Sequence, residues 1–168
     1  LKLEGNPFDD DAAKAVADAI AKNDALVGNA IEVDDERVRG PVVAAQLKRM
    51  KALWDAEKGA YPALGAGAAR DLLGKASAEG DLARTKAAVG GGADVAFSGY
   101  HNETGATTGR FTDSTAVHVA ARNGHPGLVR FLVVGAGADA DARDTDKDTG
   151  WTPCCWACFN DKPRAVRA

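Results

Sequence analysis

Apolar residues recur at helical spacing in two adjacent stretches near the end of the chain. The first stretch, residues 115–123, opens on Thr115, a residue type that caps helix N-termini, and stops at Gly124. The second begins at Pro126, which the first turn of a helix tolerates, and ends near Gly135. The apolar positions of the pair are Val117, Val119, Ala120, Ala121, Leu128, Val129, Phe131, Leu132 and Val133. Helices of about eight to ten residues are unstable alone in water, so the pair must pack against neighbours.

The same order of residues occurs in two further parts of the chain. Residues 71–95 carry small, apolar and glycine positions in matching order, and residues 150–168 begin the pattern once more. These copies resemble ankyrin repeats, because residues 115–120 (Thr-Ala-Val-His-Val-Ala) are similar to the T-P-L-H-x-A signature. Residues 150–153, Gly-Trp-Thr-Pro, are similar to the usual start of a repeat. The resemblance implies a stack of helical pairs.

The boundaries of the repeats follow from this alignment. The first copy has Asp71 and Gly74 where the signature has Thr and His, as an atypical terminal repeat would. Thr115 and Thr152 are 37 residues apart, more than the family's period of about 33 residues, so we expect the excess in connecting loops. The expected repeats span residues 69–97, 113–145 and 149–168, the last of them truncated, within a domain of residues 69–168.

The first 28 residues follow a different pattern. Leu1, Leu3 and Asn6 fit L-x-L-x-x-N, and residues 12–22 form an amphipathic helical pattern. Residues 1–28 therefore resemble one leucine-rich repeat of the ribonuclease-inhibitor type. The apolar positions of the helix are Ala13, Val16, Ala17 and Ile20. Because one such unit cannot bury its own core, and because no Met stands at position 1, we expect earlier repeats before it. An unrelated strand and helix is the alternative.

Residues 29–68 lie between the two patterns. Pro41 is a helix-start signal, and the apolar residues after it predict a helix that connects the two solenoids. The expected fold is therefore mainly α: an ankyrin-type helical repeat solenoid with a short βα leucine-rich-repeat-like unit at its N-terminal side.

Composition limits the classes of partner. The 168 residues carry a net charge of −3, without the basic excess typical of nucleic-acid binding. We see no apolar run of membrane-spanning length and no secretory leader. Three cysteines, all within residues 154–158, do not suggest a disulfide scaffold. We expect no nucleic acid, membrane or small-molecule substrate as partner, and a cytoplasmic or nuclear location.

The side chains with distinctive chemistry have structural interpretations. Cys154 and Cys158 are one helical turn apart and could share a zinc ion, but such a site needs two more ligands. Their positions on the repeat favour packing in the core. For His118, the resemblance implies a hydrogen bond with the Thr three residues before it, holding the turn between repeats. We therefore expect no catalytic residue, no cofactor and no metal.

An acidic run precedes the third copy. Asp144, Asp146 and Asp148 reproduce the first half of a calcium-binding loop. Gly150 comes one place late, however, and Cys155 stands where the loop needs a bidentate Glu. We interpret the run as the solvated tip of a connection, and calcium binding stays an open alternative.

Residues 97–113 form a long connection between the first two copies. It carries Tyr100, His101, Arg110 and Phe111, residue types that are enriched at protein interfaces. A partner-binding finger and a tolerated flexible insertion are both compatible with this composition.

The family resemblance implies a non-catalytic protein-binding module, a scaffold or adaptor, that binds on the concave surface formed by first helices and hairpin tips. The alternatives are a substrate-recruiting segment of a larger enzyme and a calcium- or zinc-dependent switch. By position, the expected contact residues are Glu79, Tyr100, Phe111, Thr112, Ser114, Arg122, Asn123, Asp148, Thr149, Trp151, Phe159 and Asn160. The short third copy is expected to leave Trp151, Trp156 and Phe159 partly uncovered.

Overall fold

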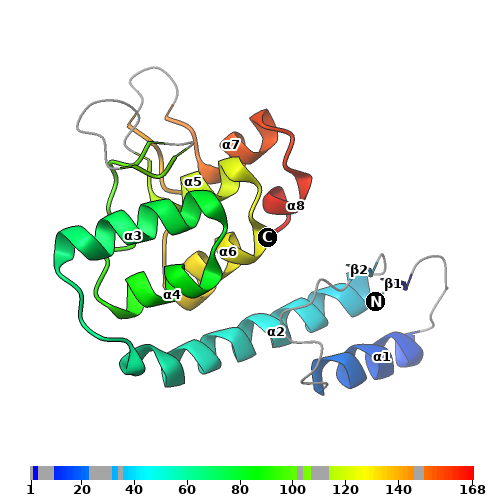
Figure 1. Cartoon of the computed structure of the whole chain (residues 1–168). Coiled ribbons are helices and arrows are strands. Elements are labelled where there is room, and N and C mark those ends of the chain that lie inside the picture. The colour runs from blue at the N-terminus through cyan, green and yellow to red at the C-terminus, as the bar shows by residue number, and fades with distance from the viewer. Residues whose placement is uncertain are drawn as a thin grey trace. The chain divides into compact units, whose positions relative to one another are not determined.

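The chain forms two compact units, residues 1–53 and residues 54–168. A computed structural model shows their elements (Figure 1). It describes residues 2–3, 10–22, 32–33, 36–101, 104–106, 114–145 and 150–168. None of the helices in these residues is long and apolar enough to cross a membrane.

The first unit is a strand, a helix and a second strand, followed by most of a long helix. These elements are β1 (Lys2–Leu3), α1 (Asp10–Lys22), β2 (Glu32–Val33) and α2 (Glu36–Glu57). The strands pair in parallel, with Lys2 opposite Glu32 and Leu3 opposite Val33. The apolar face of α1 packs with the start of α2 in a core formed by Ala13, Ala17, Ile20, Val38 and Val42, with Val16 at its edge. The amphipathic helix predicted from the sequence is thus confirmed.

Helix α2 begins five residues earlier than predicted. Pro41 is its sixth residue, so the prediction that Pro41 starts the helix is wrong. A proline inside a helix removes one backbone hydrogen bond. Val38 and Val42 lie one turn apart on either side of this point and are both buried in the unit's core. Packing of these two side chains against α1 therefore holds the helix across the proline.

The second unit contains three helical pairs. They are α3 (Ala66–Glu79) with α4 (Leu82–Gly90), α5 (Ala116–Asn123) with α6 (Pro126–Arg130), and α7 (Pro153–Phe159) with α8 (Pro163–Val166). Helix α6 continues directly into a π-helical turn, η3 (Phe131–Gly135). The first helices of the pairs lie beside one another, α3 against α5 and α5 against α7 (Figure 1). This is the stack of helical pairs that the sequence predicted.

The boundaries of α5 match the sequence prediction closely. Thr115 is the N-cap, and Gly124 ends the helix in the left-handed conformation, with φ of 80°. Gly80 ends α3 in the same way, with φ of 75°. Each of these glycines also lies close to the N-cap residue of the next repeat's second helix. A Cβ at Gly80 would lie 2.5 Å from the ring of His125, and one at Gly124 would lie 2.7 Å from the side chain of Lys162. His125 Nε2 also hydrogen-bonds the Ala78 carbonyl at 2.9 Å, which ties the first two repeats together.

The second unit extends back to Trp54, beyond the expected start of the repeats at residue 69. Trp54 is 3 % exposed and stands edge-on against Phe131, with ring centroids 5.0 Å apart. Tyr61, which follows the short 3-10 helix η2 (Lys58–Ala60), packs near the same tryptophan, with ring centroids 5.9 Å apart. The last turn of α2 is therefore part of the repeat core.

The described residues of the 97–113 connection pack against α3. Tyr100 is fully buried, and its hydroxyl donates to the Arg70 carbonyl at 3.2 Å. Gly74 and Gly105 approach so closely that a Cβ on Gly74 would lie 2.0 Å from the Gly105 carbonyl oxygen. Phe97 stacks edge-on against Tyr100, with ring centroids 5.0 Å apart. These contacts fix both described parts of the connection to the first repeat.

Candidate functional site

Three aromatic side chains of the third pair form a cluster, here named the aromatic patch: Trp151, Trp156 and Phe159. Their ring centroids are 4.8 to 6.2 Å apart. Phe159 is 68 % exposed, and the two tryptophans are half-buried. The prediction that these three rings are partly uncovered is confirmed.

A buried carboxylate holds the two tryptophans in place. Asp144 is 3 % exposed, and its Oδ1 accepts a hydrogen bond from the Trp151 backbone N–H at 2.8 Å. Its Oδ2 accepts one from Trp156 Nε1 at 2.6 Å. Asp144 therefore belongs to the base of the patch, and its interpretation as part of a solvated acidic tip is wrong. Asp146 and Asp148 lie outside the described residues.

His118 holds the same segment from the preceding repeat. Its Nδ1 lies 2.8 Å from Thr115 Oγ1 and 3.2 Å from the Thr115 backbone N–H, and its Nε2 lies 3.0 Å from the Trp151 carbonyl oxygen. Because a carbonyl oxygen only accepts, Nε2 carries the proton and Nδ1 accepts from Thr115. Burial lowers the pKa of His118, which favours this neutral form. The role implied by the resemblance, holding the turn between repeats, is confirmed.

Polar side chains at the ends of α5 and α7 border the aromatic patch. The Arg122 guanidinium lies 4.8 Å from the centroid of the Trp156 ring. Asn123 and Asn160 occupy matching positions, and each donates from its side-chain amide at 2.8 Å to the carbonyl one turn back, on Val119 and Trp156 respectively. Their amide groups are therefore fixed at the two helix ends.

A family model described as ankyrin repeats, three copies, matches residues 73–168, more than half of the chain. The chain belongs to the ankyrin repeat family. Comparison with curated proteins found no match. Ankyrin repeats are generally modules for binding other proteins, and the family is typically non-catalytic.

The ankyrin stack brings part of the expected contact set together. Arg122, Trp151, Phe159 and Asn160 lie on or beside the aromatic patch, and Asn123 follows Arg122 at the end of α5. Trp156 was not among the expected contact residues, although it joins Arg122 to the other two rings. Trp156 stands one place after the signature's His position, at the variable position x of T-P-L-H-x-A, and an aromatic residue there could have indicated a contact.

Other expected contact residues lie elsewhere. Tyr100 and Ser114 are fully buried, and the Ser114 carbonyl accepts from the Tyr100 backbone N–H at 3.1 Å, so both are corrected from contact to core residues. Glu79 is exposed at the end of α3 and pairs with Arg84. The remaining four expected contacts lie outside the described residues: Phe111, Thr112, Asp148 and Thr149.

The three cysteines of α7 are exposed, so the prediction that Cys154 and Cys158 are buried by packing is wrong. Cys154 lines an apolar groove among α5, α6, α7 and α8 that is open to solvent. Partial burial, with a smaller effect of the neighbouring Cys158 thiol, raises the pKa of Cys154. The hydrogen bond from the Thr152 hydroxyl lowers the pKa of Cys155. Among the described residues no group of three His, Cys, Asp or Glu side chains could hold a metal ion.

Proposed function

We propose that the aromatic patch and its polar border bind a partner protein and that the chain acts as a non-catalytic scaffold or adaptor. The observation that carries the proposal is the exposure of Phe159, 68 %, beside two half-buried tryptophans and an arginine. Tryptophan and arginine dominate the binding energy of protein interfaces, and burying an exposed phenyl ring adds about 2 kcal/mol.

The rigidity of the patch supports the same proposal. Both oxygens of Asp144 accept hydrogen bonds from the tryptophans, and the His118 ring holds the carbonyl of Trp151. Side chains that are fixed before binding lose less conformational entropy when a partner arrives, which leaves more of the contact energy for affinity.

The test is selection of peptides from a displayed library against the full chain, followed by affinity measurements with two variants. Phe159→Ala removes the most exposed ring, and we expect it to weaken the selected peptides at least about tenfold, in line with the loss of a hot-spot side chain. Leu82→Ala is the matched control, because Leu82 is also exposed, 41 %, but starts α4. Peptides that depend on Leu82 and ignore Phe159 would contradict the proposal.

We also propose that the first unit is of the leucine-rich-repeat type. The parallel pairing of β1 with β2 supports this, because a helix separates two strands whose paired residues, Lys2 and Glu32, lie 30 positions apart. Adjacent leucine-rich repeats place their strands in parallel at a similar period. Cross-strand nuclear Overhauser effects between residues 2–3 and 32–33 are expected, and an antiparallel pattern would refute the assignment.

An intracellular location is proposed as well. Three free cysteines are exposed on one short helix, and such thiols persist in a reducing compartment. Imaging of the tagged chain in its cell of origin tests this, and secretion into the medium would contradict it.

A further inference from the structure

We propose that Cys154 and Cys158 form a dithiol site for a thiophilic Lewis acid, and that an organic trivalent arsenical is the class of ligand that fits it. This site is separate from the aromatic patch, so its test does not depend on the proposed partner-binding function.

The two thiols are placed to act together. Cys154 and Cys158 lie four residues apart on α7, which puts them one turn apart on one face of the helix. Both side chains are exposed and neither is in a disulfide, so a reagent can reach both sulfurs at once. Cys155, between them in sequence, points its sulfur to a different partner, the Thr152 hydroxyl at 3.4 Å.

The site offers two sulfur atoms, and this number limits which metal or metalloid centre it can bind. Structural zinc needs four protein ligands and catalytic zinc needs three. Since no group of three His, Cys, Asp or Glu side chains is assembled in the described residues, the pair suits a centre that two thiols satisfy. Trivalent arsenic that carries one carbon substituent has two positions left for sulfur.

The bond changes balance without an oxidant or a reductant. In the hydrated arsenical, two As–O bonds break and two As–S bonds form. The two thiol protons leave on the released oxygens as two molecules of water, and arsenic stays trivalent. The second As–S bond forms within the first adduct, so the pair holds the ligand far more tightly than one thiol would.

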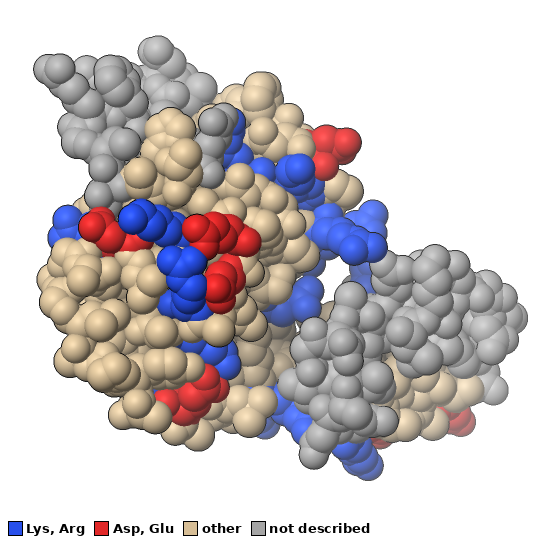
Figure 2. Space-filling view, in the orientation of Figure 1, with Lys and Arg blue, Asp and Glu red and all other residues tan. Residues whose placement is uncertain are grey.

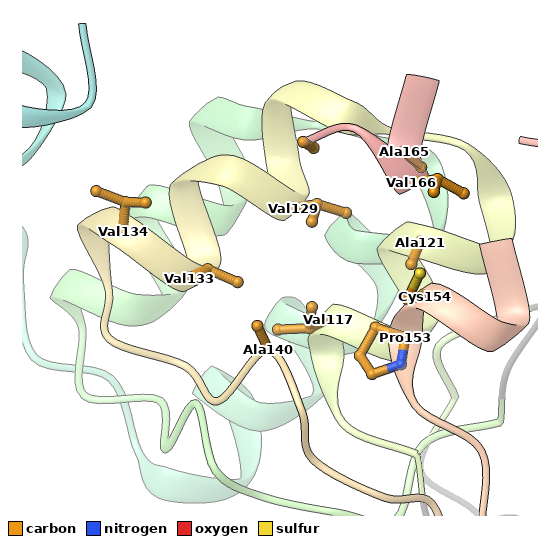
Figure 3. A pocket seen from close by; sticks show the side chains of 11 residues that line it. Val117, Ala121, Val129, Val133, Val134, Ala140, Pro153, Cys154, Ala165 and Val166 are labelled. Atoms are coloured by element: carbon orange, nitrogen blue, oxygen red, sulfur yellow. The ribbon is translucent and has the colours of Figure 1, made fainter. Parts of the chain in front are cut away.

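An apolar groove beside Cys154 provides room for the organic substituent. The groove has a volume of about 230 Å³ and lies among α5, α6, α7 and α8. Its walls near the sulfur are Ala121, Pro153, Ala165 and Val166, with Val129 opposite (Figure 3). Apolar cavities of about 150 Å³ already accept a benzene ring. A phenyl group on arsenic can therefore be buried in the groove while the thiols hold the arsenic at the groove's edge.

The test uses phenylarsine oxide on the full chain, with free thiols counted by a chromogenic disulfide. One equivalent is expected to reduce the three reactive thiols to one, with one arsenical per chain by native mass spectrometry. Cys155→Ser is the matched control and should bind as the parent does. Cys154→Ser and Cys158→Ser should each weaken binding at least about 100-fold, because each leaves a single arsenic–sulfur bond. Inorganic arsenite, which lacks the phenyl group, should bind less tightly to the parent.

Two results would overturn the proposal. One is unchanged affinity in either Cys154→Ser or Cys158→Ser, and the other is loss of binding in Cys155→Ser. All three positions are exposed, so serine is not expected to perturb folding, and circular dichroism of each variant checks this.

Discussion

At the scale of single residues, His118 makes the stability of the repeats depend on pH. Burial lowers its pKa in the folded chain, so the unfolded chain, with a pKa of about 6.5, takes up a proton first as the pH falls. Stability is therefore full above pH ~6.5 and falls below it, by at most about 1.4 kcal/mol per pH unit, until the folded form is also protonated. Urea denaturation at a series of pH values between 7.5 and 5 measures this slope.

The variant His118→Gln separates this effect from the other ionisable groups. It removes the titrating ring, so we expect lower stability at pH 7.5, where the hydrogen bonds to Thr115 and Trp151 are lost, but a smaller slope below pH ~6.5. An unchanged slope in His118→Gln would assign the pH dependence to another group.

The cysteines should differ in reactivity toward monofunctional reagents. The Thr152 hydroxyl lowers the pKa of Cys155, whereas partial burial raises that of Cys154, and the thiolate is the nucleophile. Iodoacetamide at pH 7 should therefore alkylate Cys155 before Cys154, as followed by peptide mass spectrometry over time. The variant Thr152→Val should slow the alkylation of Cys155, and equal rates at the two cysteines would contradict the assignment. An arsenical, by contrast, is expected to bind Cys154 and Cys158 and to leave Cys155 free, because it needs two thiols on one face of the helix.

At the scale of elements, the contact between α3 and the 97–113 connection depends on two glycines. A Cβ at Gly74 would lie 2.0 Å from the Gly105 carbonyl oxygen and 2.6 Å from the Tyr100 ring. Gly74→Ala should therefore destabilise the chain by about 1 to 3 kcal/mol through overpacking. Gly67, near the start of the same helix, has nothing within 4 Å of its Cβ position. Gly67→Ala should leave stability unchanged or raise it by up to about 1 kcal/mol. Chemical denaturation measures both, and similar effects would show that the contact is not tight.

Local chemistry explains which elements could be predicted from the sequence. The ends of α5 depend on Thr115 and Gly124, whose capping roles are intrinsic to the residue types, so its boundaries agree with the prediction. The start of α2 depends on the burial of Val38 and Val42 against another helix, which Pro41 conceals in the sequence. Strand β2 has two residues, too few for an alternating pattern, and is defined only by its pairing with β1.

At the scale of the whole molecule, surface exposure was harder to predict than repeat position. The register of the repeats grouped Arg122, Trp151 and Phe159, and the structure places them close together because the register is set by the sequence period. Whether a position is covered depends on which segment packs over it. Tyr100 has an interface-type side chain but is buried against α3, whereas Cys154 stands where the repeat pattern predicts a core residue and is exposed at the edge of a groove.

Charged side chains are unevenly mixed over the repeats. In the face shown in Figure 2, acidic and basic side chains lie side by side over α3 and α4, whereas the charged side chains toward α7 and α8 are mostly basic. Several of them pair with each other, as Lys86 does with Glu57 at 2.9 Å and Arg84 with Glu79. Exposed pairs of this kind contribute about 0 to 1 kcal/mol, so they set neither the fold nor the partner.

The boundary between the two units yields the last prediction. Trp54 is 3 % exposed against Phe131, whereas its neighbour Leu53 is 57 % exposed. Trp54→Ala should cost the repeat unit about 3 to 5 kcal/mol because it leaves a cavity beside Phe131, the residue that directly follows α6. Leu53→Ala should change stability by less than about 0.5 kcal/mol. Since the chain has two units, the readout is hydrogen exchange of peptides from α6, which reports on the repeats alone. Faster exchange there in Trp54→Ala, with parental exchange in Leu53→Ala, is the expected result. If Trp54→Ala leaves α6 as protected as in the parent, the repeats are stable without the last turn of α2, and their start belongs closer to residue 66.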